Sequence, residues 1–177
     1  MFILYGVIAG LVVGRLAGGR VDRLADLRIR WAWLAIAGLA AQVVLFLPTI
    51  GDALGPVAPW LYAGSTAAIL AVILVNLRIP GLALVAAGAA CNLAAIVANG
   101  GYMPVSPAAL ASLGWEQAPG YSNSATIADP ALAPLTDVLA MPSWLPFANV
   151  FSVGDVLIAV GLATTIALAM RRRPATA

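Results

Sequence analysis

The sequence predicts an all-α integral membrane protein with about five transmembrane helices and a long external loop that holds short helices. Hydrophobic residues make up 63% of the 177 residues, charged residues make up only 9%, and the mean hydropathy is +1.01. Soluble domains are about 45–50% apolar and about 25% charged. A water-soluble globular domain and an intrinsically disordered chain are therefore both excluded.

Five apolar stretches approach the roughly 20 residues that a helix needs to cross a bilayer. We expect spans at residues 2–17, 31–47, 56–77, 79–98 and 150–170 of one membrane domain, residues 1–177. The first stretch has no basic segment before it and no small-residue cleavage site, so we expect a retained span and not a signal peptide. Helix is the expected state because lipid offers the backbone no hydrogen-bond partners.

The arginines predict the orientation. All nine basic residues are Arg, and they lie between the first two spans, between the third and fourth, and around the inner ends of the first and last. Alternating spans place every one on the same side, which the positive-inside rule assigns to the cytoplasm. We therefore expect an external N-terminus and a cytoplasmic C-terminus. The Ala- and Arg-rich, Lys-free composition favours a bacterial plasma membrane.

Two features near the N-terminus predict contacts with helices or lipid. A ridge of small residues recurs every fourth position in the first span, at Gly6, Gly10, Gly14 and Gly18. Such a ridge lets another helix approach closely, either within the chain, where residues 79–98 are the natural partner, or in a second copy. Residues 19–30 have the pattern of a short interfacial helix, whose arginines either fix the orientation or meet anionic lipid head groups.

Residues 99–149 form one long external segment that contains seven of the twelve prolines. Loops of this length are usually functional or disordered. Ser106-Pro107, with Gly114 following, has the start and stop signals of a short helix, and Asp129-Pro130 begins a second such pattern. We therefore expect an extracytoplasmic lid of short helices.

Asp155 is the principal candidate for a functional residue, because it falls in the outer third of the last span. A carboxylate at mid-membrane costs roughly 2.5–3.5 kcal/mol on insertion scales and usually faces the bundle interior or a water-filled cavity. A structural Asp, bonded to Ser152, Asn149 or free N–H groups at a helix start, is an equal alternative. The expected binding residues around an outward-facing polar cavity are Asn92, Asn99, Gly100, Gly101, Tyr102, Asn149, Ser152 and Asp155.

Missing residue types exclude several chemistries. The chain has no His, no Lys and a single Cys, Cys91. It can form neither an intramolecular disulfide nor a His-rich or Cys-rich metal site. We therefore expect no cofactor and no metal. No basic surface alternates with exposed aromatic residues, so a nucleic-acid partner is not expected.

The last two spans resemble those of the lipoprotein signal peptidase family, which uses two membrane-embedded Asp residues. Cys91-Asn92-Leu93-Ala94-Ala95 is similar to its Gly-Asn-x-x-Asp motif, and Phe151-Ser152-Val153-Gly154-Asp155 to its Phe-Asn-x-Ala-Asp motif. The resemblance implies an Asp-dependent membrane peptidase in which Asp155 is catalytic. Ala95 occupies the position of the first Asp, so Asp129 or Asp137 of the lid would have to supply the second acid.

The chain also resembles an uncharacterised family of small multi-pass bacterial proteins, a domain of unknown function. The resemblance rests on Asn-Gly-Gly-x-Met-Pro-Val at residues 99–105 and on Pro-Phe-x-Asn-Val-Phe-Ser-x-Gly-Asp at residues 146–155. It implies no activity.

Three functions remain open. The first is a non-catalytic membrane protein whose outer polar cavity binds an amphiphile, such as a lipid or lipidated peptide, or docks a partner membrane subunit. The second is the Asp-dependent peptidase. The third, a small transporter, is disfavoured because Asp155 is the single clearly intramembrane acid and no inverted repeat is present.

Overall fold

The computed structural model describes residues 2–116 and 122–171, and it is mostly helical, as predicted. Five apolar helices occupy the five expected segments: α1 (Phe2–Leu16), α2 (Ala32–Leu45), α4 (Ala58–Val75), α5 (Leu82–Ala98) and α7 (Val153–Arg171). Two helical stretches are long and apolar enough to cross a membrane, Thr49–Val75 and Val153–Arg171. The first of these also includes the 3-10 helix η2 (Gly55–Val57) and all but the first residue of α3 (Pro48–Leu54).

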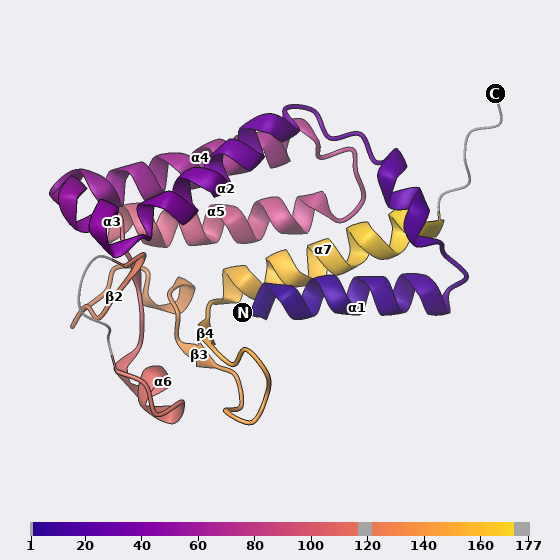
Figure 1. The fold of residues 1–177 in the computed structure, drawn as a ribbon. Helices are drawn as coiled ribbons and strands as arrows, with labels where there is room; N and C mark the ends of the chain where they lie inside the picture. The colour runs from indigo at the N-terminus through magenta and orange to yellow at the C-terminus, as the bar shows by residue number, and fades with distance from the viewer. Residues whose placement is uncertain (1, 117–121, 172–177) are drawn as a thin grey trace.

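The five helices form a row in the order α2, α4, α5, α7, α1 (Figure 1). The glycine ridge of α1 packs against α7, which runs parallel to it. A Cβ at Gly6 would lie 2.6 Å from Ala159 Cα, and one at Gly10 would lie 2.9 Å from Ala163 Cα. The packing is therefore within the chain, and the expectation that residues 79–98 form the partner is wrong. Ala159, Ala163 and Ala167 share the four-residue spacing of the glycines, which explains the choice of α7.

The helix α5 packs on the other side of α7, antiparallel to it and again through glycine. A Cβ at Gly88 would lie 3.0 Å from the Ile158 backbone nitrogen, and one at Gly161 would lie 2.6 Å from a Val85 methyl group. Small residues on three helices therefore bring the α7 backbone close to both neighbours. The α2–α4 pair is held differently, since the Gln42 side-chain amide donates to the Ser65 hydroxyl at 3.0 Å.

The arginines of the described residues lie in the last turns of α1 and α7 and in the α1–α2 and α4–α5 connections. These segments lie at the same end of the helix axes, here called the arginine end (Figure 1). The predicted interfacial helix of residues 19–30 is only a 3-10 helix, η1 (Val21–Asp26), because its backbone is fixed at both sides. The Arg20 N–H donates to the Met170 carbonyl at 2.9 Å, and the Arg30 N–H donates to Asn76 Oδ1 at 2.9 Å. Arg172 and Arg173 lie outside the described residues.

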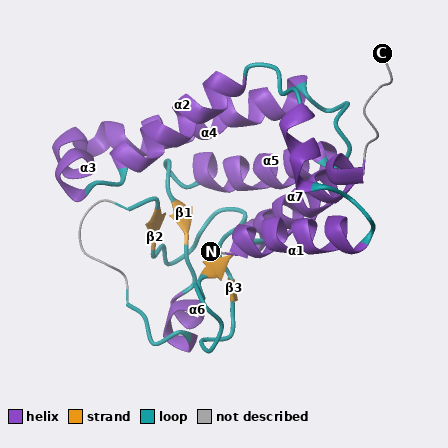
Figure 2. Ribbon diagram, turned by 45° about the vertical axis from the view of Figure 1, so that its right-hand side comes forward, coloured by secondary structure: helices purple, strands orange, loops and turns teal. Residues whose placement is uncertain are grey.

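The opposite end carries a small folded unit, here called the cap, residues 99–152 (Figure 2). It contains α6 (Pro107–Ser112), η3 (Ala133–Leu135) and four two-residue strands: β1 (Met103–Pro104), β2 (Ser124–Ala125), β3 (Leu139–Ala140) and β4 (Val150–Phe151). Strand β1 pairs in parallel with β2, with Met103 opposite Ser124, and β3 pairs antiparallel with β4. Residues 117–121 of the cap lie outside the described residues.

The cap differs from a lid made only of short helices. The helix expected after Ser106 is present, and the Ser106 hydroxyl accepts from the Ala109 N–H at 3.4 Å. The second expected helix is wrong, since only the 3-10 turn η3 forms there. Leu132 has a φ of +54°, and Pro134 cannot donate a helical hydrogen bond. Extended chain therefore follows η3 and pairs with neighbouring segments.

The cap is packed on the bundle and not suspended above it. Met103 joins a buried apolar cluster with Ala63 of α4 and with Ala95 and Ile96 of α5. On the other side, the Phe151 ring stacks on Phe2 with centroids 4.1 Å apart, and the Tyr5 hydroxyl donates to the Pro146 carbonyl at 2.6 Å. The cap therefore bridges α1, α4 and α5.

Candidate functional site

The first turn of α7 is built around a reciprocal pair of hydrogen bonds. Ser152 Oγ accepts from the Asp155 N–H at 3.0 Å, and Asp155 Oδ2 accepts from the Ser152 N–H at 3.1 Å. This arrangement is a capping box, with an acid three residues after the N-cap Ser. Ser152 is fully buried, whereas Asp155 is partly exposed. The pattern Ser-x-x-Asp therefore explains why the helix begins at this point.

Asn92 of α5 extends this box across the helix interface. Its Nδ2 donates to Asp155 Oδ1 at 2.9 Å, and its Oδ1 accepts from Ser152 Oγ at 2.8 Å. Gly154 makes room for the amide, because a Cβ there would lie 2.7 Å from Asn92 Cγ. We call Asn92, Ser152 and Asp155 the α5–α7 polar junction. The Asp155 carboxylate therefore has a structural role at the start of α7, and a role in binding or catalysis would be additional to it.

Asp137 of the cap provides a second carboxylate near this junction. Its backbone is held between Pro104 and Ser106, with its N–H donating to the Pro104 carbonyl and its carbonyl accepting from the Ser106 N–H, both at 3.0 Å. Burial, followed by the negative charge of Asp155, raises the pKa of Asp137 to about 7. Of the two lid acids considered from the sequence, Asp137 thus lies within electrostatic range of Asp155. Asp129 is on the exposed surface.

Tyr62 of α4 is a polar group at this site that the sequence reasoning missed. Its ring packs on the buried cluster beneath the cap. The hydroxyl is hydrogen-bonded with the Asn123 side chain and lies within electrostatic range of Asp137 and Asp155. A Tyr near the start of a mostly apolar helix, two residues after Trp60, was the available signal, but it also fits an aromatic belt.

The other predicted site residues do not belong to the polar junction. Asn99 ends α5 and fixes the cap, donating from Nδ2 to the Ala131 carbonyl and accepting at Oδ1 from the Ala131 N–H, both at 2.9 Å. Gly100 and Gly101 have φ values of +71° and +90°, and Gly101 packs directly on Pro59. The left-handed backbone and close approach expected for this turn are therefore present. Tyr102 follows it and is partly buried.

Asn149 lies where the cap chain returns to α7. Its Nδ2 donates to the Val150 carbonyl at 2.7 Å, and its backbone carbonyl accepts from the Met141 N–H at 3.1 Å. Its Oδ1 is buried and has no hydrogen-bond partner among the described residues. Buried acceptors normally have a partner. Among the described residues, Asn149 is therefore the one side chain with a buried polar atom that has no hydrogen-bond partner.

The arrangement at the cap end supports hydrogen bonding and proton exchange more readily than metal binding. Within residues 2–116 and 122–171, no three His, Cys, Asp or Glu side chains gather into a possible metal site. One carboxylate, Asp155, accepts bonds through both oxygens, while the other, Asp137, holds its proton up to near-neutral pH. A protonated Asp137 can donate a hydrogen bond while the Asp155 oxygens accept them, so the two acids together offer a ligand both a donor and acceptors.

A family model described as a family of unknown function, DUF5317, matches residues 26–167. The chain belongs to this family. The match covers four of the five apolar helices almost completely, together with the whole cap, and the resemblance to an uncharacterised family is confirmed. No curated protein and no solved structure matches the chain. Membership of DUF5317 therefore implies no activity for the chain.

Proposed function

We propose that the chain is a bacterial plasma-membrane protein with five spans, an external N-terminus and a cytoplasmic C-terminus. The exposed faces of the helices support this proposal, since large apolar side chains cover them: Ile36 is 66% exposed and Val43 is 69% exposed. Contiguous apolar surface of this kind normally faces lipid or a partner. The positive-inside rule assigns the arginine end to the cytoplasm, and the cap is then extracytoplasmic.

At the outer surface, the protein binds an amphiphile through a polar site between Asp155 and the cap, without catalysing a reaction. The observation that carries this proposal is that Asp137 lies within electrostatic range of Asp155, at an end of the molecule where the described residues include no basic side chain. Because the chain lacks Lys and His, and the described arginines lie at the other end, no described basic side chain neutralises this pair. A ligand with an ammonium group or several hydrogen-bond donors fits such a site.

An apolar cavity on the same half of the molecule can accommodate the tail of such a ligand. It has a volume of about 620 Å³ and lies between α2, α3 and α4, with Leu45, Ile50 and Leu61 in its wall. Tyr62 follows Leu61 and faces the cap cluster. The α4 helix therefore carries groups suited to a tail on one side and to a polar head on the other.

The test is native mass spectrometry of the full chain purified in a mild detergent, followed by extraction of bound molecules. We expect a retained amphiphile whose amount falls at least ten-fold in Asp137→Asn, while Asp129→Asn, a matched control in the same segment, retains it. Equal retention in both variants would refute the site. Co-purification of a second membrane protein that depends on Asp137 would instead indicate the partner-subunit alternative.

The second candidate is the Asp-dependent peptidase, and the coupling between Asp137 and Asp155 is the observation that favours it. Aspartic hydrolases require two nearby carboxylates that share a proton, one acting as base and the other as acid. Asp137 would supply the second carboxylate, which the motif lacks because Ala95 occupies the position of its first Asp. Hydrolysis of a lipidated peptide by the wild type, lost in Asp155→Asn and Asp137→Asn but kept in Asp129→Asn, would establish this activity. Intact peptide after prolonged incubation with folded protein would exclude it.

A further inference from the structure

We infer that the arginine end carries a binding site for one anionic phospholipid, with an acyl chain in the groove between α1 and α7 and the phosphate on Arg23 and Arg171. This inference rests on the membrane location in the proposed function, but it concerns the opposite end of the molecule. It assigns a ligand to a groove and a charge cluster that the site at Asp155 does not use.

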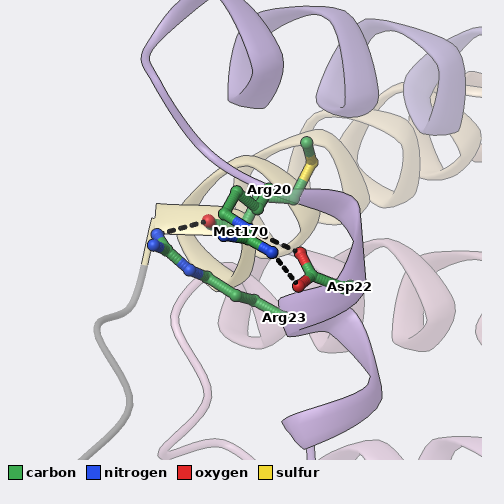
Figure 3. Close-up of polar contacts among 4 residues, drawn as sticks. All are labelled: Arg20, Asp22, Arg23 and Met170. Atoms are coloured by element: carbon green, nitrogen blue, oxygen red, sulfur yellow. Dashed lines mark hydrogen bonds and ion pairs between the residues drawn. The ribbon is translucent and has the colours of Figure 1, made fainter.

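The charge cluster is built by packing η1 against the last turn of α7. The Arg23 guanidinium donates through Nη1 to the Met170 carbonyl at 3.2 Å, beside the Arg20 N–H bond to the same carbonyl (Figure 3). Arg171 follows Met170 directly. Arg23 therefore contacts the backbone of the residue that precedes Arg171, so both arginines lie at the same end of α7.

Positive charge at this helix end is only partly compensated. Arg20 forms an ion pair with Asp22, with Nη2 and Oδ2 2.8 Å apart (Figure 3). This is the ion pair found among the described residues. Asp22 also lies within electrostatic range of Arg23, but neither Arg23 nor Arg171 forms an ion pair within the described part of the chain. Among the described residues, the hydrogen-bond partner found for the Arg23 guanidinium is the neutral Met170 carbonyl. Guanidinium groups with free donors are well suited to phosphate oxygens.

The groove begins beside this cluster and has a volume of about 300 Å³. Val13 and Ala17 form its α1 wall, and the α7 wall runs from Ala163 to Arg171. At about 1.5 Å per residue, that wall is roughly 12 Å long, most of the depth of one leaflet's hydrocarbon, which is about 15 Å. The Thr164 hydroxyl donates within its own helix to the Val160 carbonyl, so the wall between Ala163 and Leu168 presents no unsatisfied side-chain donor. An acyl chain fits this apolar wall, and Arg171 lies at the depth of its head group.

The magnitude follows from membrane electrostatics. Each Arg near a membrane surface favours an anionic lipid by about 1 kcal/mol, which corresponds to about five-fold in binding. Two such residues give roughly 25–30-fold enrichment of an anionic over a zwitterionic phospholipid. A diffuse surface charge would give a similar total enrichment, but that enrichment would not depend on which arginines are replaced.

The test uses the full chain in bilayers of equimolar phosphatidylglycerol and phosphatidylethanolamine, with bound lipids counted by native mass spectrometry. We expect strong enrichment of phosphatidylglycerol in the wild type and loss of most of it in the double variant Arg23→Gln/Arg171→Gln. Arg28→Gln/Arg78→Gln, which has the same net charge, should retain it. Equal losses in the two double variants would overturn the inference. Arg171→Gln alone, on an exposed side chain, should lower enrichment about five-fold and provides a test if the Arg23 variant misfolds.

A second pair of variants tests the groove. Val13→Trp should block it and reduce retention of phosphatidylglycerol, whereas Val12→Trp, on a similarly exposed residue outside the groove, should not. Unchanged retention in Val13→Trp would overturn the inference. Flotation of the protein with the bilayers separates the two proposals: failure to float contradicts the membrane location, while flotation without enrichment contradicts only the lipid site.

Discussion

Removing the Asn92 side chain should loosen the contact between α5 and α7 at the outer site. Asn92→Ala deletes the donor to Asp155 Oδ1 at 2.9 Å and the acceptor for Ser152 Oγ at 2.8 Å. A hydrogen bond to a charged group contributes about 1.5–3 kcal/mol in soluble proteins, but interhelical bonds measured in a membrane protein average about 0.6 and reach about 1.7 kcal/mol. We therefore expect a decrease of about 1–3 kcal/mol in the free energy of unfolding.

A double-mutant cycle isolates the bond between the two residues. Unfolding of Asn92→Ala, Asp155→Ala and the double variant is measured in mixed micelles by tryptophan fluorescence, and we expect a coupling energy of about 1–2 kcal/mol. The pair Gln42→Ala and Asp155→Ala is the control, since Gln42 bonds to α4 on the far side of the row, and its effects should add within about 0.5 kcal/mol. A coupling for Asn92 and Asp155 no larger than this control would refute the polar junction.

Three further predictions follow from the packing and the cap. Gly10→Ala should destabilise the α1–α7 pair, because its Cβ would meet Ala163 at 2.9 Å, whereas Gly64→Ala, in open space, should be neutral or slightly stabilising in thermal unfolding. Asn99→Ala removes both bonds to Ala131 and should increase hydrogen exchange around residue 131 without changing exchange in α1. The pKa of Asp137, about 7 in the folded chain and near 4 when unfolded, means that the folded state binds the proton more tightly. Its contribution to stability should therefore be complete below about pH 4 and lost as the pH rises to about 7, and melting curves of Asp137→Asn should lack this slope.

The sequence was sufficient to predict elements that depend on local patterns. Apolar length defined the five helices, and Ser106-Pro107 defined the start of α6. The helix predicted to pack on the glycine ridge was wrong, because periodicity reveals a contact face but not which helix packs on it. The prediction of a second cap helix was wrong because it relied on the apolar spacing after Pro130. In the structure, Pro134 and the positive φ of Leu132 limit this segment to a 3-10 turn.

The part of the site where the Asn92 and Asp155 motifs meet was predictable from the sequence. The part that forms where the cap packs on the bundle was not. Asn92, Ser152 and Asp155 were all expected at the site, and the structure brings them into one hydrogen-bonded group. Asp137 and Tyr62 approach through strand pairing and through packing of the cap on α4, which are contacts between distant segments. No local pattern encodes such contacts, so the sequence offered Asp129 and Asp137 as alternatives without deciding between them, and it did not indicate Tyr62.

A density map of the full chain purified in mild detergent tests the central claim most directly. The proposed function predicts elongated density from a bound molecule that reaches the space between Asp137 and Asp155 and continues along the apolar face of α4. Side chains of the cap closing directly onto Asp155, with no density beside either carboxylate, would contradict it.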